Sequence, residues 1–499
     1  MKNQRERIMQ NPAEGKNIVV IGSGVGGLSA GIILSLLNYF VTIVEKNPLP
    51  GGLMRSYRRG GIDCPVGVHY VGALGAQEPL GKMFRILGIP VEDLFTRMGE
   101  SGIIDRYIFD DFVFDLPVSI DDFEKSLKST FPAETVALDV ILKNLREIAG
   151  RMLDPSFLLN QGEPFQNMDF FQPMGEFLDK LDVSTDLRTI LAMPCHLIGV
   201  ELAQCPMIFH HMVLAGYLFS SWRLKVSGST MADVFTRRFQ ELGGKLILND
   251  GCDKIILDEG EVAGARLNSG TLLSADTVVA AVHPKILLDL LEPDALKSSY
   301  RQRILNLKET EGVIAIQISV DASAHPEIDH NIYQRYTDEK GLSEEGIFYQ
   351  LRRSNNKDVN LVSSFTRSLY SEWSRWENTI SGKRGKDYEE KKLSIGQNLL
   401  QKANEVFGGL KNARILDIFT PLTLRDYVNC PEGSCYGVLR SSGQLLKVAS
   451  LSKPPISGLF LAGQNAVAPG VLGTILGSFN AARQIIGASR FAEEIKWEV

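Results

Sequence analysis

Two short apolar runs flank a glycine-rich turn near the start of the chain. Ile18–Ile21 and Val41–Val44 have the pattern of strands buried on both faces, and Leu28–Leu37 between them predicts a helix. No charged residue occurs from 17 to 44, a length that would suffice for a membrane span. The five glycines inside this stretch favour a strand, a turn and a buried helix instead.

A strand–loop–helix pattern also occurs near the C-terminus. The apolar run 458–463 predicts a short buried strand, and 474–486 predicts a helix behind a glycine-containing loop. Between the two ends, residues 243–280 have the pattern of a helix end, successive short strands and a final buried strand. The chain therefore alternates strands and helices, which predicts an α/β fold.

The remaining intervals predict a second, mixed region. Residues 120–130 and 136–152 have helical patterns, 312–320 and 359–365 are strand-like, and the charged stretch 372–392 is expected to be a solvated helical segment with loops. From Leu202 to Trp222 no residue is charged, yet Pro206 and Gly216 argue against an uninterrupted membrane helix. We interpret this stretch as a buried helix that lines an apolar cavity, with plain core packing or membrane contact as alternatives.

Composition narrows the class of protein. The 499 residues include 53 Lys and Arg against 59 Asp and Glu, a net charge of −6, so no basic excess is present to hold nucleic acid. Hydrophobic residues make up 44%, which is ordinary for a soluble globular protein. The six cysteines contain no Cys-x-x-Cys pair, and adjacent His210 and His211 do not have metal-ligand spacing, so we expect reduced thiols and no metal site.

The N-terminal turn has the spacing of a dinucleotide-binding motif. Gly22, Gly24 and Gly27 form Gly-x-Gly-x-x-Gly directly between the predicted strand and helix. The first glycine permits the tight turn, the second lets the backbone approach a pyrophosphate, and the third lets helix and strand pack closely. Ser23 and Gly26 lie inside the motif, where free N–H groups at the helix start favour phosphate charge. A glycine-rich turn without a ligand is the structural alternative.

The residues that follow the second strand favour FAD over NAD. Glu45 is placed to accept hydrogen bonds from ribose hydroxyls. Lys46, the pair Gly51–Gly52, Met54 and Arg55 come directly afterwards, and a second glycine pair here is typical of glutathione-reductase-like flavoproteins, whose loop runs along the cofactor. Because no second Gly-x-Gly-x-x-Gly occurs, a dedicated nicotinamide domain is not expected.

Further motifs resemble one family across nearly the whole chain. They are Gly67-Val-His-Tyr-Val-Gly72, Gly228–Ser229, Thr420–Tyr427 continuing through Pro431–Gly437, and Leu461–Asn465. Together with the N-terminal motif they are similar to the phytoene desaturase, carotenoid isomerase and retinol saturase superfamily, most of all to its retinol saturase branch. This resemblance implies FAD, a hydrophobic polyene or isoprenoid substrate, and redox or isomerisation chemistry at carbon–carbon double bonds.

The same resemblance implies where the cofactor is held. The C-terminal helix is expected to direct its N–H groups, through Gly470, Val471 and Leu472, toward the pyrimidine end of the flavin. Gly463 and Gln464 belong to this segment, and the chain near Cys252 is expected to pass the adenine.

The expected domain organisation follows from these segments. A glutathione-reductase-like, Rossmann-type FAD-binding domain is assembled from residues 15–75, 226–300 and 411–490. An α+β substrate-binding or cap domain is inserted as residues 76–225 and 301–410, and residues 1–14 form a polar tail without a signal-peptide core.

The candidate proton donors are His69 and Tyr70, with Tyr427 as a third, because the resemblance places the segment of the first two near the flavin ring. Packing or backbone hydrogen bonding is the alternative role for both. We expect a cytoplasmic protein with peripheral membrane contact and an external electron donor or acceptor. An amine-oxidase-like flavoenzyme and a non-catalytic prenyl- or lipid-binding protein on the same fold are the alternative functions.

Overall fold

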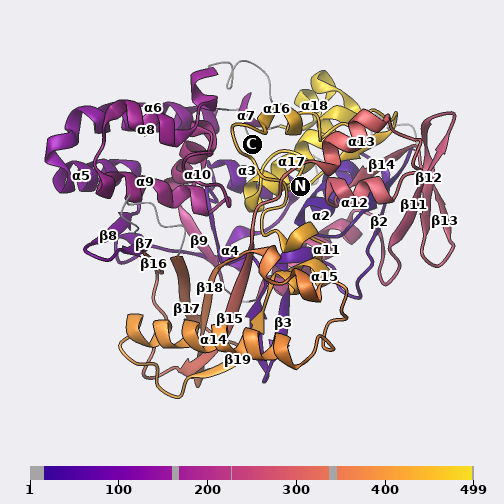
Figure 1. Cartoon of the computed structure of the whole chain (residues 1–499). Coiled ribbons are helices and arrows are strands. Elements are labelled where there is room, and N and C mark those ends of the chain that lie inside the picture. Colours follow the sequence, from indigo (N-terminus) through magenta and orange to yellow (C-terminus); the bar gives the residue numbers. More distant parts are fainter. Residues whose placement is uncertain (1–15, 155, 160–167, 226, 337–345, 497–499) are drawn as a thin grey trace.

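The computed structural model describes residues 16–154, 156–159, 168–225, 227–336 and 346–496 (Figure 1). The predicted polar tail lies outside these residues. A five-stranded parallel sheet, ordered β10-β2-β1-β14-β20, is built from three separated stretches of the chain. Its strands are β1 (Asn17–Ile21), β2 (Phe40–Val44), β10 (Lys245–Ile247), β14 (Thr277–Ala280) and β20 (Leu459–Leu461). The apolar runs of the sequence are the buried strands of this sheet, which confirms the predicted α/β, Rossmann-type architecture.

Three helices pack together against this sheet. They are α2 (Val25–Leu36), α11 (Gly228–Glu241) and α17 (Gly470–Ile486), and α2 contacts both of the others. Nearly every residue of α2 is buried, which explains why its sequence lacks a polar face. The charge-free stretch 17–44 therefore forms β1, α2 and β2, as predicted.

A seven-stranded sheet, ordered β19-β15-β18-β17-β16-β7-β8, forms a second layer. It is antiparallel except between β7 and β16. Its strands are β7 (Ile103–Ile108), β8 (Val113–Pro117), β15 (Gly312–Asp321), β16 (Asn331–Arg335), β17 (Gly346–Arg353), β18 (Val359–Ser368) and β19 (Arg414–Phe419). The helix α14 (Lys386–Val406) lies across it in the lower part of Figure 1. Strand β19 falls within the segment 411–490, yet it pairs with β15 of this sheet rather than with the parallel one.

A group of helices covers the far end of the seven-stranded sheet, at the upper left of Figure 1. Its members are α5 (Ile120–Thr130), α6 (Thr135–Leu153), α8 (Met174–Leu181), α9 (Thr185–His196) and α10 (Met207–Phe219). Pro206 directly precedes α10, so the charge-free stretch 202–222 becomes a loop, one buried helix and the start of a strand.

Smaller elements complete the fold. The small sheets consist of β3 (Ser56–Arg59) with β4 (Ile62–Pro65); β5 (Tyr70–Gly72), β9 (Ser221–Leu224) and β6 (Phe95–Arg97); and β11 (Cys252–Asp258), β12 (Glu261–Leu267) and β13 (Leu272–Ser274). The remaining helices are α3 (Pro79–Leu87), α4 (Val91–Leu94), α7 (Ser156–Leu159), α12 (Pro284–Asp289), α13 (Ser298–Leu305), α15 (Pro421–Val428), α16 (Leu445–Val448) and α18 (Ala488–Glu494).

The prediction of a solvated segment over 372–392 is wrong in part. Trp373 and Trp376 are buried, and both rings contact that of Tyr388 at centroid distances of 5.5 and 5.4 Å. These aromatic side chains belong to the core under the seven-stranded sheet, and the charged residues between them remain at the surface.

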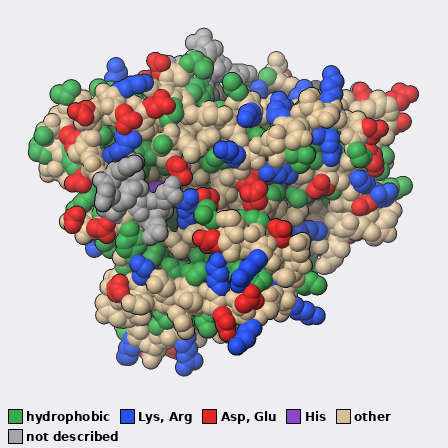
Figure 2. All heavy atoms as spheres, in the orientation of Figure 1, with side chains coloured by type: hydrophobic (Ala, Val, Ile, Leu, Met, Phe, Trp, Pro, Cys, Tyr) green, Lys and Arg blue, Asp and Glu red, His purple; other side chains and the backbone are tan. Residues whose placement is uncertain are grey.

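One face of the molecule shows how its surface charges are distributed. On the side drawn in Figure 2, acidic and basic side chains of the described residues are interspersed without a large patch of one sign. Within the described ranges, every helix is too short or too polar to cross a lipid bilayer. All six cysteines are free thiols.

Candidate cofactor and substrate site

The three motif glycines have different surroundings in the structure. Gly22 has φ +96° and its N–H donates to Val44 O at 2.9 Å, which turns the chain off β1. A Cβ atom on Gly27 would lie 1.9 Å from Gly22 O, so α2 packs against the turn at a distance that only glycine permits. A Cβ on Gly24 would meet only Gly52 Cα, at 4.0 Å. The space beside Gly24 is therefore open, so a ligand can approach the backbone of the turn there.

The second glycine pair forms a wall beside that opening. Gly51 and Gly52 have φ of +115° and +53°, values that L side chains rarely adopt. Gly51 N donates to Ser23 O at 2.8 Å, and Met54 N donates to Gly51 O at 2.9 Å, which closes the turn. The loop therefore lies directly against the dinucleotide motif.

Two helix N-termini lack side-chain caps. Helix α2 begins after Gly24 and α17 after Pro469; neither has a capping hydrogen bond or an acidic residue in its first turn. Their first N–H groups and positive dipole ends are therefore available to anionic groups. Gly470 has φ +78° with open space around its Cβ position, and Val471 and Leu472 follow it. These features fit a dinucleotide that spans both helix starts.

Glu45 is buried at the end of β2. Its Oε2 accepts from Ser23 N at 3.0 Å and from Ser23 Oγ at 2.7 Å, and its Oε1 accepts from Asn47 N at 2.9 Å. A carboxylate has about four acceptor positions. Its Oε1 also accepts from Asn47 Nδ2 at 2.8 Å, so Ser23 and Asn47 together occupy these positions. Glu45 thus stabilises the glycine turn, and a ribose hydroxyl would have to replace or share one of these hydrogen bonds.

Two cationic side chains lie next to the second glycine pair. Burial lowers the pKa of Lys46 and also that of Arg55. Arg55 donates to Gly52 O and to Tyr427 O, each at 3.2 Å. Within the described part of the chain, neither cation forms an ion pair, so their charge suits the pyrophosphate of a dinucleotide.

Cys252 begins β11 close to Glu45 and Lys46. Asp250 N donates to Glu45 O at 3.1 Å, and a Cβ on Gly251 would lie 2.9 Å from Lys46 Cβ. Burial raises the pKa of Cys252 to about 12, so the thiol is protonated at neutral pH. The structure thus places this residue at the same end of the site as Glu45.

Gly463 and Gln464 close the site from the C-terminal side. Gly463 has φ +83° and its Cα lies against Gly26. The guanidinium of Arg440, which the sequence did not single out, donates to Asn465 O at 2.6 Å and approaches Gln464 O at 3.5 Å. Arg440 is buried, and burial lowers its pKa to about 10, which leaves it cationic. No ion pair involves Arg440 among the described residues.

A cavity of about 530 Å³ extends from the start of α17 into the region between the two sheets and the helical group. Gly470, Val471 and Leu472 lie in its wall at one end. Helix α10 contributes Phe209, Met212, Val213, Gly216 and Tyr217. The prediction that the charge-free stretch forms a buried helix lining an apolar cavity is therefore confirmed.

Aromatic rings form one side of this cavity, which we call the aromatic wall. Its members are His69, Tyr70, Tyr217, Tyr333, Phe348 and Phe365. Neighbouring centroids are 4.5 to 6.4 Å apart, for example 4.6 Å between Tyr70 and Tyr217. Such a surface suits a flat, apolar, conjugated ligand.

His69 lies between two phenyl rings, at centroid distances of 5.4 Å to Phe348 and 5.1 Å to Phe365. Burial, reinforced by the Arg352 charge, lowers its pKa to about 3. Its Nδ1 has no hydrogen-bond partner among the described residues. His69 is therefore a neutral ring at physiological pH.

Tyr70 is the neighbouring member of the wall. Its hydroxyl donates to Asp105 Oδ2 at 3.1 Å and lies 2.9 Å from the Tyr333 hydroxyl. Burial raises its pKa well above 10, so the phenol keeps its proton. The structure brings His69 and Tyr70 together at the cavity, but it does not bring Tyr427 there. Tyr427 is 53% exposed, and its hydroxyl lies 3.3 Å from Ser381 Oγ.

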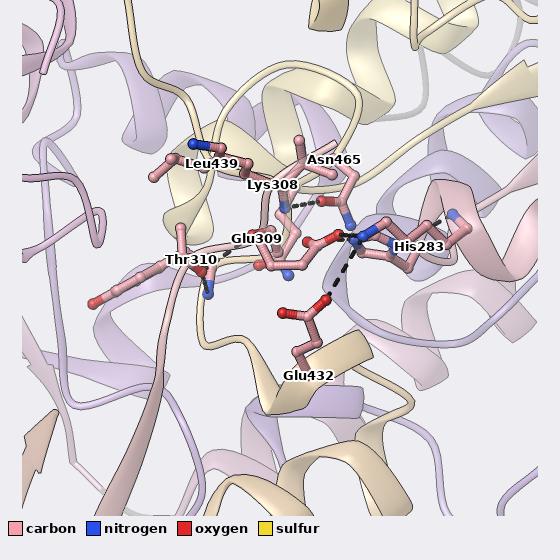
Figure 3. Close-up of polar contacts among 12 residues, drawn as sticks. His283, Lys308, Glu309, Thr310, Glu432, Leu439 and Asn465 are labelled. Atoms are coloured by element: carbon pink, nitrogen blue, oxygen red, sulfur yellow. Dashed lines mark hydrogen bonds and ion pairs between the residues drawn. The ribbon is translucent and has the colours of Figure 1, made fainter. Parts of the chain in front are cut away.

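A cluster of charged side chains around the buried Glu309 also reaches the cavity wall, and Figure 3 shows Glu309 beside His283 with Glu432 below them. Glu309 Oε2 lies 2.9 Å from His283 Nε2, and Glu309 Oε1 lies 2.8 Å from Lys285 Nζ. Burial alone would raise the pKa of Glu309, but the contacts with His283 and Lys285 lower it overall. Glu432 is the outer member, 4.0 Å from Lys285. The cluster was not predicted, because its partners come from distant segments.

His210 and His211 contact each other, which their spacing in the sequence did not predict. The two Nδ1 atoms are 2.8 Å apart, and His210 Nε2 lies 2.6 Å from Leu191 O. Over the described ranges, no group of three or more His, Cys, Asp or Glu side chains has the arrangement of a metal site.

Comparison with known proteins identifies relatives over nearly the full length. The family described as flavin containing amine oxidoreductase matches residues 25–486. All-trans-retinol 13,14-reductase from Macaca fascicularis is 23% identical over 535 aligned residues, which cover 96% of this chain and 86% of that protein. Prolycopene isomerase 2, chloroplastic, from an Oncidium hybrid cultivar is 23% identical, with 97% and 85% covered.

The fold is similar to that of solved structures. The crystal structure of an oxidoreductase from Methanosarcina mazei superposes with a TM-score of 0.68 at 15% sequence identity, covering 94% of this chain and 100% of that one. The resemblance predicted from the sequence motifs is confirmed by these relatives.

Proposed function

The chain belongs to the family of flavin-containing amine oxidoreductases, and we propose that within this family it acts on carbon–carbon double bonds of a hydrophobic polyene or isoprenoid. Membership of this family shows that the protein is an FAD-dependent oxidoreductase. The observation that carries the finer proposal is the cavity, which joins the uncapped start of α17 to the aromatic wall and the apolar face of α10. A long conjugated chain matches such a lining better than a small polar substrate does.

The charges around the cavity support a substrate without an ammonium group. Three glutamates line the cavity, and two of them are paired: Glu309 with Lys285 and His283, and Glu311 with Arg367. The third, Glu201, is exposed and accepts a hydrogen bond from Gln204 Nε2 at 3.2 Å. An amine substrate is bound best by a carboxylate or an open aromatic cage. The carboxylates of Glu309 and Glu311 are already neutralised by their own partners.

The relatives suggest which reactions to test. The names of two relatives refer to reduction of all-trans-retinol and to isomerisation of prolycopene. For this chain we propose retinol-saturase-like reduction, or desaturation or isomerisation of a similar polyene. When bound, FAD supplies hydride transfer to or from a carbon atom of the substrate.

The protein's own residues would bind the cofactor and provide a proton. The motif at Gly22, Gly24 and Gly27, the loop at Gly51–Gly52 and the start of α17 would hold the phosphates and the ring through backbone N–H groups. Glu45 would bind a ribose hydroxyl. Of the two candidate proton donors, Tyr70 is the better placed, because a histidine with a pKa of about 3 is not in the acidic imidazolium form at neutral pH, and because only Tyr70 has a hydrogen bond to a carboxyl group.

Electron supply and membrane contact form part of the proposal. The cofactor would exchange electrons with an external donor or acceptor, since the sequence contains one dinucleotide motif. At the C-terminal end of α6, Met152 lines the cavity and the adjacent Leu153 is 40% exposed. We propose that this region contacts a membrane or another carrier of the hydrophobic substrate.

The direct test is turnover by the flavin-loaded protein. Purified holoenzyme, chemically reduced under anaerobic conditions, is incubated with all-trans-retinol or prolycopene, and products are separated by mass. Gain of two hydrogens shows saturation, loss of two from oxidised enzyme shows desaturation, and an unchanged mass with a new retention time shows isomerisation. Oxidation of an amine without turnover of any polyene would instead identify an amine oxidase. A purified protein that cannot be loaded with flavin would overturn the proposal that this chain is an enzyme.

A further inference from the structure

A hydrogen-bonded network of buried polar side chains lies directly behind the aromatic wall. Asp105 Oδ2 accepts from the Tyr70 hydroxyl at 3.1 Å, and Asp105 Oδ1 accepts from Asn331 Nδ2 at 2.9 Å. Gln350 Nε2 in turn donates to Asn331 Oδ1 at 2.9 Å and to His69 O at 3.2 Å. The network therefore connects a carboxyl group to both residues of the His69–Tyr70 pair.

Three strands of the seven-stranded sheet hold this network in place. Asp105 lies on β7, Asn331 is its register partner on the parallel strand β16, and Gln350 lies on β17. Their exposed fractions are 1%, 0% and 0%. Side chains fixed on adjacent strands keep their relative positions better than side chains on loops.

Among the residues that the structure describes, none forms an ion pair with the Asp105 carboxyl. Tyr70 faces it from β5, Tyr333 from β16, Tyr107 from its own strand and Tyr217 from α10, and none of these carries a charge at neutral pH. The cation of the described segments that acts on it is Arg223 of β9, whose guanidinium lies 3.5 Å from Glu327 and donates to Ile328 O at 2.6 Å.

Burial therefore raises the pKa of Asp105 to about 7, although the hydrogen bonds from Asn331 and Tyr70 oppose this. A large fraction of the carboxyl groups carries a proton at neutral pH. The protonated carboxyl can donate to the Tyr70 oxygen, which frees the Tyr70 proton for another acceptor.

From this geometry we propose that Asp105 is the proton store of the cavity and that Tyr70 passes the stored proton to the substrate. The inference rests on the proposed reduction of a double bond, in which reduced flavin provides the electron pair. The Tyr70 O–H bond breaks as a C–H bond forms at the substrate carbon. The Asp105 O–H bond then breaks as the Tyr70 O–H bond re-forms, which leaves an Asp105 carboxylate to be reprotonated from solvent.

Asp105 acts through Tyr70 as a positioning residue, because its carboxyl contacts the Tyr70 hydroxyl and does not line the cavity. Tyr70 and Tyr333 line the cavity, whereas Asp105, Asn331 and Gln350 lie behind them. A relay of this kind removes the need for a charged acid inside an apolar pocket, where an unpaired charge would be costly.

The test compares Asp105→Asn with a matched control, Asp115→Asn. Asn keeps the size of the side chain but has no acidic proton. Asp115 lies on the neighbouring strand β8, is partly exposed and pairs with Arg106 at 2.8 Å, outside the network. We expect Asp105→Asn to lower kcat at least about tenfold with little change in KM, and to abolish the fall in kcat above about pH 7. Asp115→Asn is expected to keep wild-type kcat, and Asp105→Glu to recover part of the loss.

A second readout separates the proton store from the proposed reaction. Because the folded-state pKa of Asp105 is raised, folding takes up a proton between about pH 4 and 7, and wild-type stability falls relative to Asp105→Asn as pH rises through that window. We expect the Tm difference between the two proteins, measured on flavin-loaded samples, to change in that direction, whereas Asp115→Asn tracks wild type.

Two results overturn the inference. One is an Asp105→Asn enzyme with the wild-type kcat and pH profile. The other is a Tm difference between wild type and Asp105→Asn that does not vary with pH, which shows that Asp105 holds no proton. If wild type turns over no polyene at all, the proposed function fails, and the Tm comparison alone decides whether Asp105 stores a proton.

Discussion

A Cβ atom on Gly26 would lie 2.6 Å from the Cα atom of Gly463, so the N-terminal motif and the C-terminal loop meet backbone to backbone. Ser478 Oγ of α17 adds a hydrogen bond to Gly26 O at 2.7 Å. The N-terminal motif and the C-terminal loop thus lie together through a contact that only glycine allows.

Gly26→Ala is therefore expected to destabilise the protein itself. The added methyl group has to displace backbone, and overpacking of this kind costs about 1–3 kcal/mol. Thermal unfolding of the flavin-free protein measures the effect directly. We expect a lower Tm together with weaker flavin binding, because the starts of α2 and α17 move apart.

Gly24→Ala is the matched control for that experiment. Gly24 has φ −64°, which alanine adopts readily, and its Cβ position is open. The Tm of the flavin-free protein should change little, while the flavin dissociation constant should rise because the methyl group occupies the side on which the backbone approaches the phosphates. Wild-type flavin affinity in Gly24→Ala would show that the cofactor does not pass this turn.

Substitutions at His69 and Tyr70 are expected to have unequal effects. Tyr70→Phe removes the only hydroxyl of the pair and should lower turnover by about 10²–10⁴-fold, the usual contribution of a general acid. His69→Gln should have a smaller effect, because a neutral ring between Phe348 and Phe365 acts by packing. Steady-state kinetics with a polyene substrate measures both. A stable double variant that retains turnover would show that neither residue transfers the proton.

The glycine framework of the site was predictable because each part is contiguous in sequence. A strand, a turn and a helix with Gly22, Gly24 and Gly27 form one local unit, and its chemistry depends on backbone geometry that those residues impose. Even so, α17 begins at Gly470, one turn earlier than its apolar pattern indicated, because the first turn of this helix is formed by the loop glycines.

The aromatic wall was not predictable to the same extent. Tyr333 meets Tyr70 across 263 positions of sequence, and the two side chains come from strands of different sheets, β16 and β5. Nothing in the local pattern of a strand states which strand of another sheet it will face. Glu309 and Arg440 were missed for a similar reason, since each acquires its significance from burial and from partners in other segments.

Acid is expected to destabilise the fold through its buried histidines. Burial lowers the pKa of His69 to about 3 and of His210 to about 4, whereas an unfolded histidine titrates near 6.5. The folded state therefore binds fewer protons than the unfolded state, so stability is complete above about pH 6.5 and decreases as the pH falls toward these values.

Each such histidine lowers the free energy of unfolding by up to about 1.4 kcal/mol for each pH unit below 6.5. Chemical denaturation at pH 7 and pH 5 measures the loss, and His210→Gln is expected to reduce the slope. Asp105 acts in the opposite direction, because its raised pKa favours the folded state at low pH. An equal slope in His210→Gln and wild type would show that His210 is not the buried neutral group described here.

Filling the cavity beside α10 should impair substrate binding while leaving the cofactor in place. Gly216 lines the cavity, and its Cβ position meets only Ala73 Cβ at 3.9 Å and Met152 Cε at 4.0 Å. Gly216→Leu therefore extends a side chain into the space proposed for the polyene, and KM for a long substrate should rise about tenfold or more with unchanged flavin absorbance.

Gly150→Leu is the control, because it makes the same change in the exposed part of α6 with nothing within 4 Å. Both variants gain helix propensity, so a shared effect on activity would reflect the helices rather than the cavity. An unchanged KM in Gly216→Leu would show that the substrate binds away from α10.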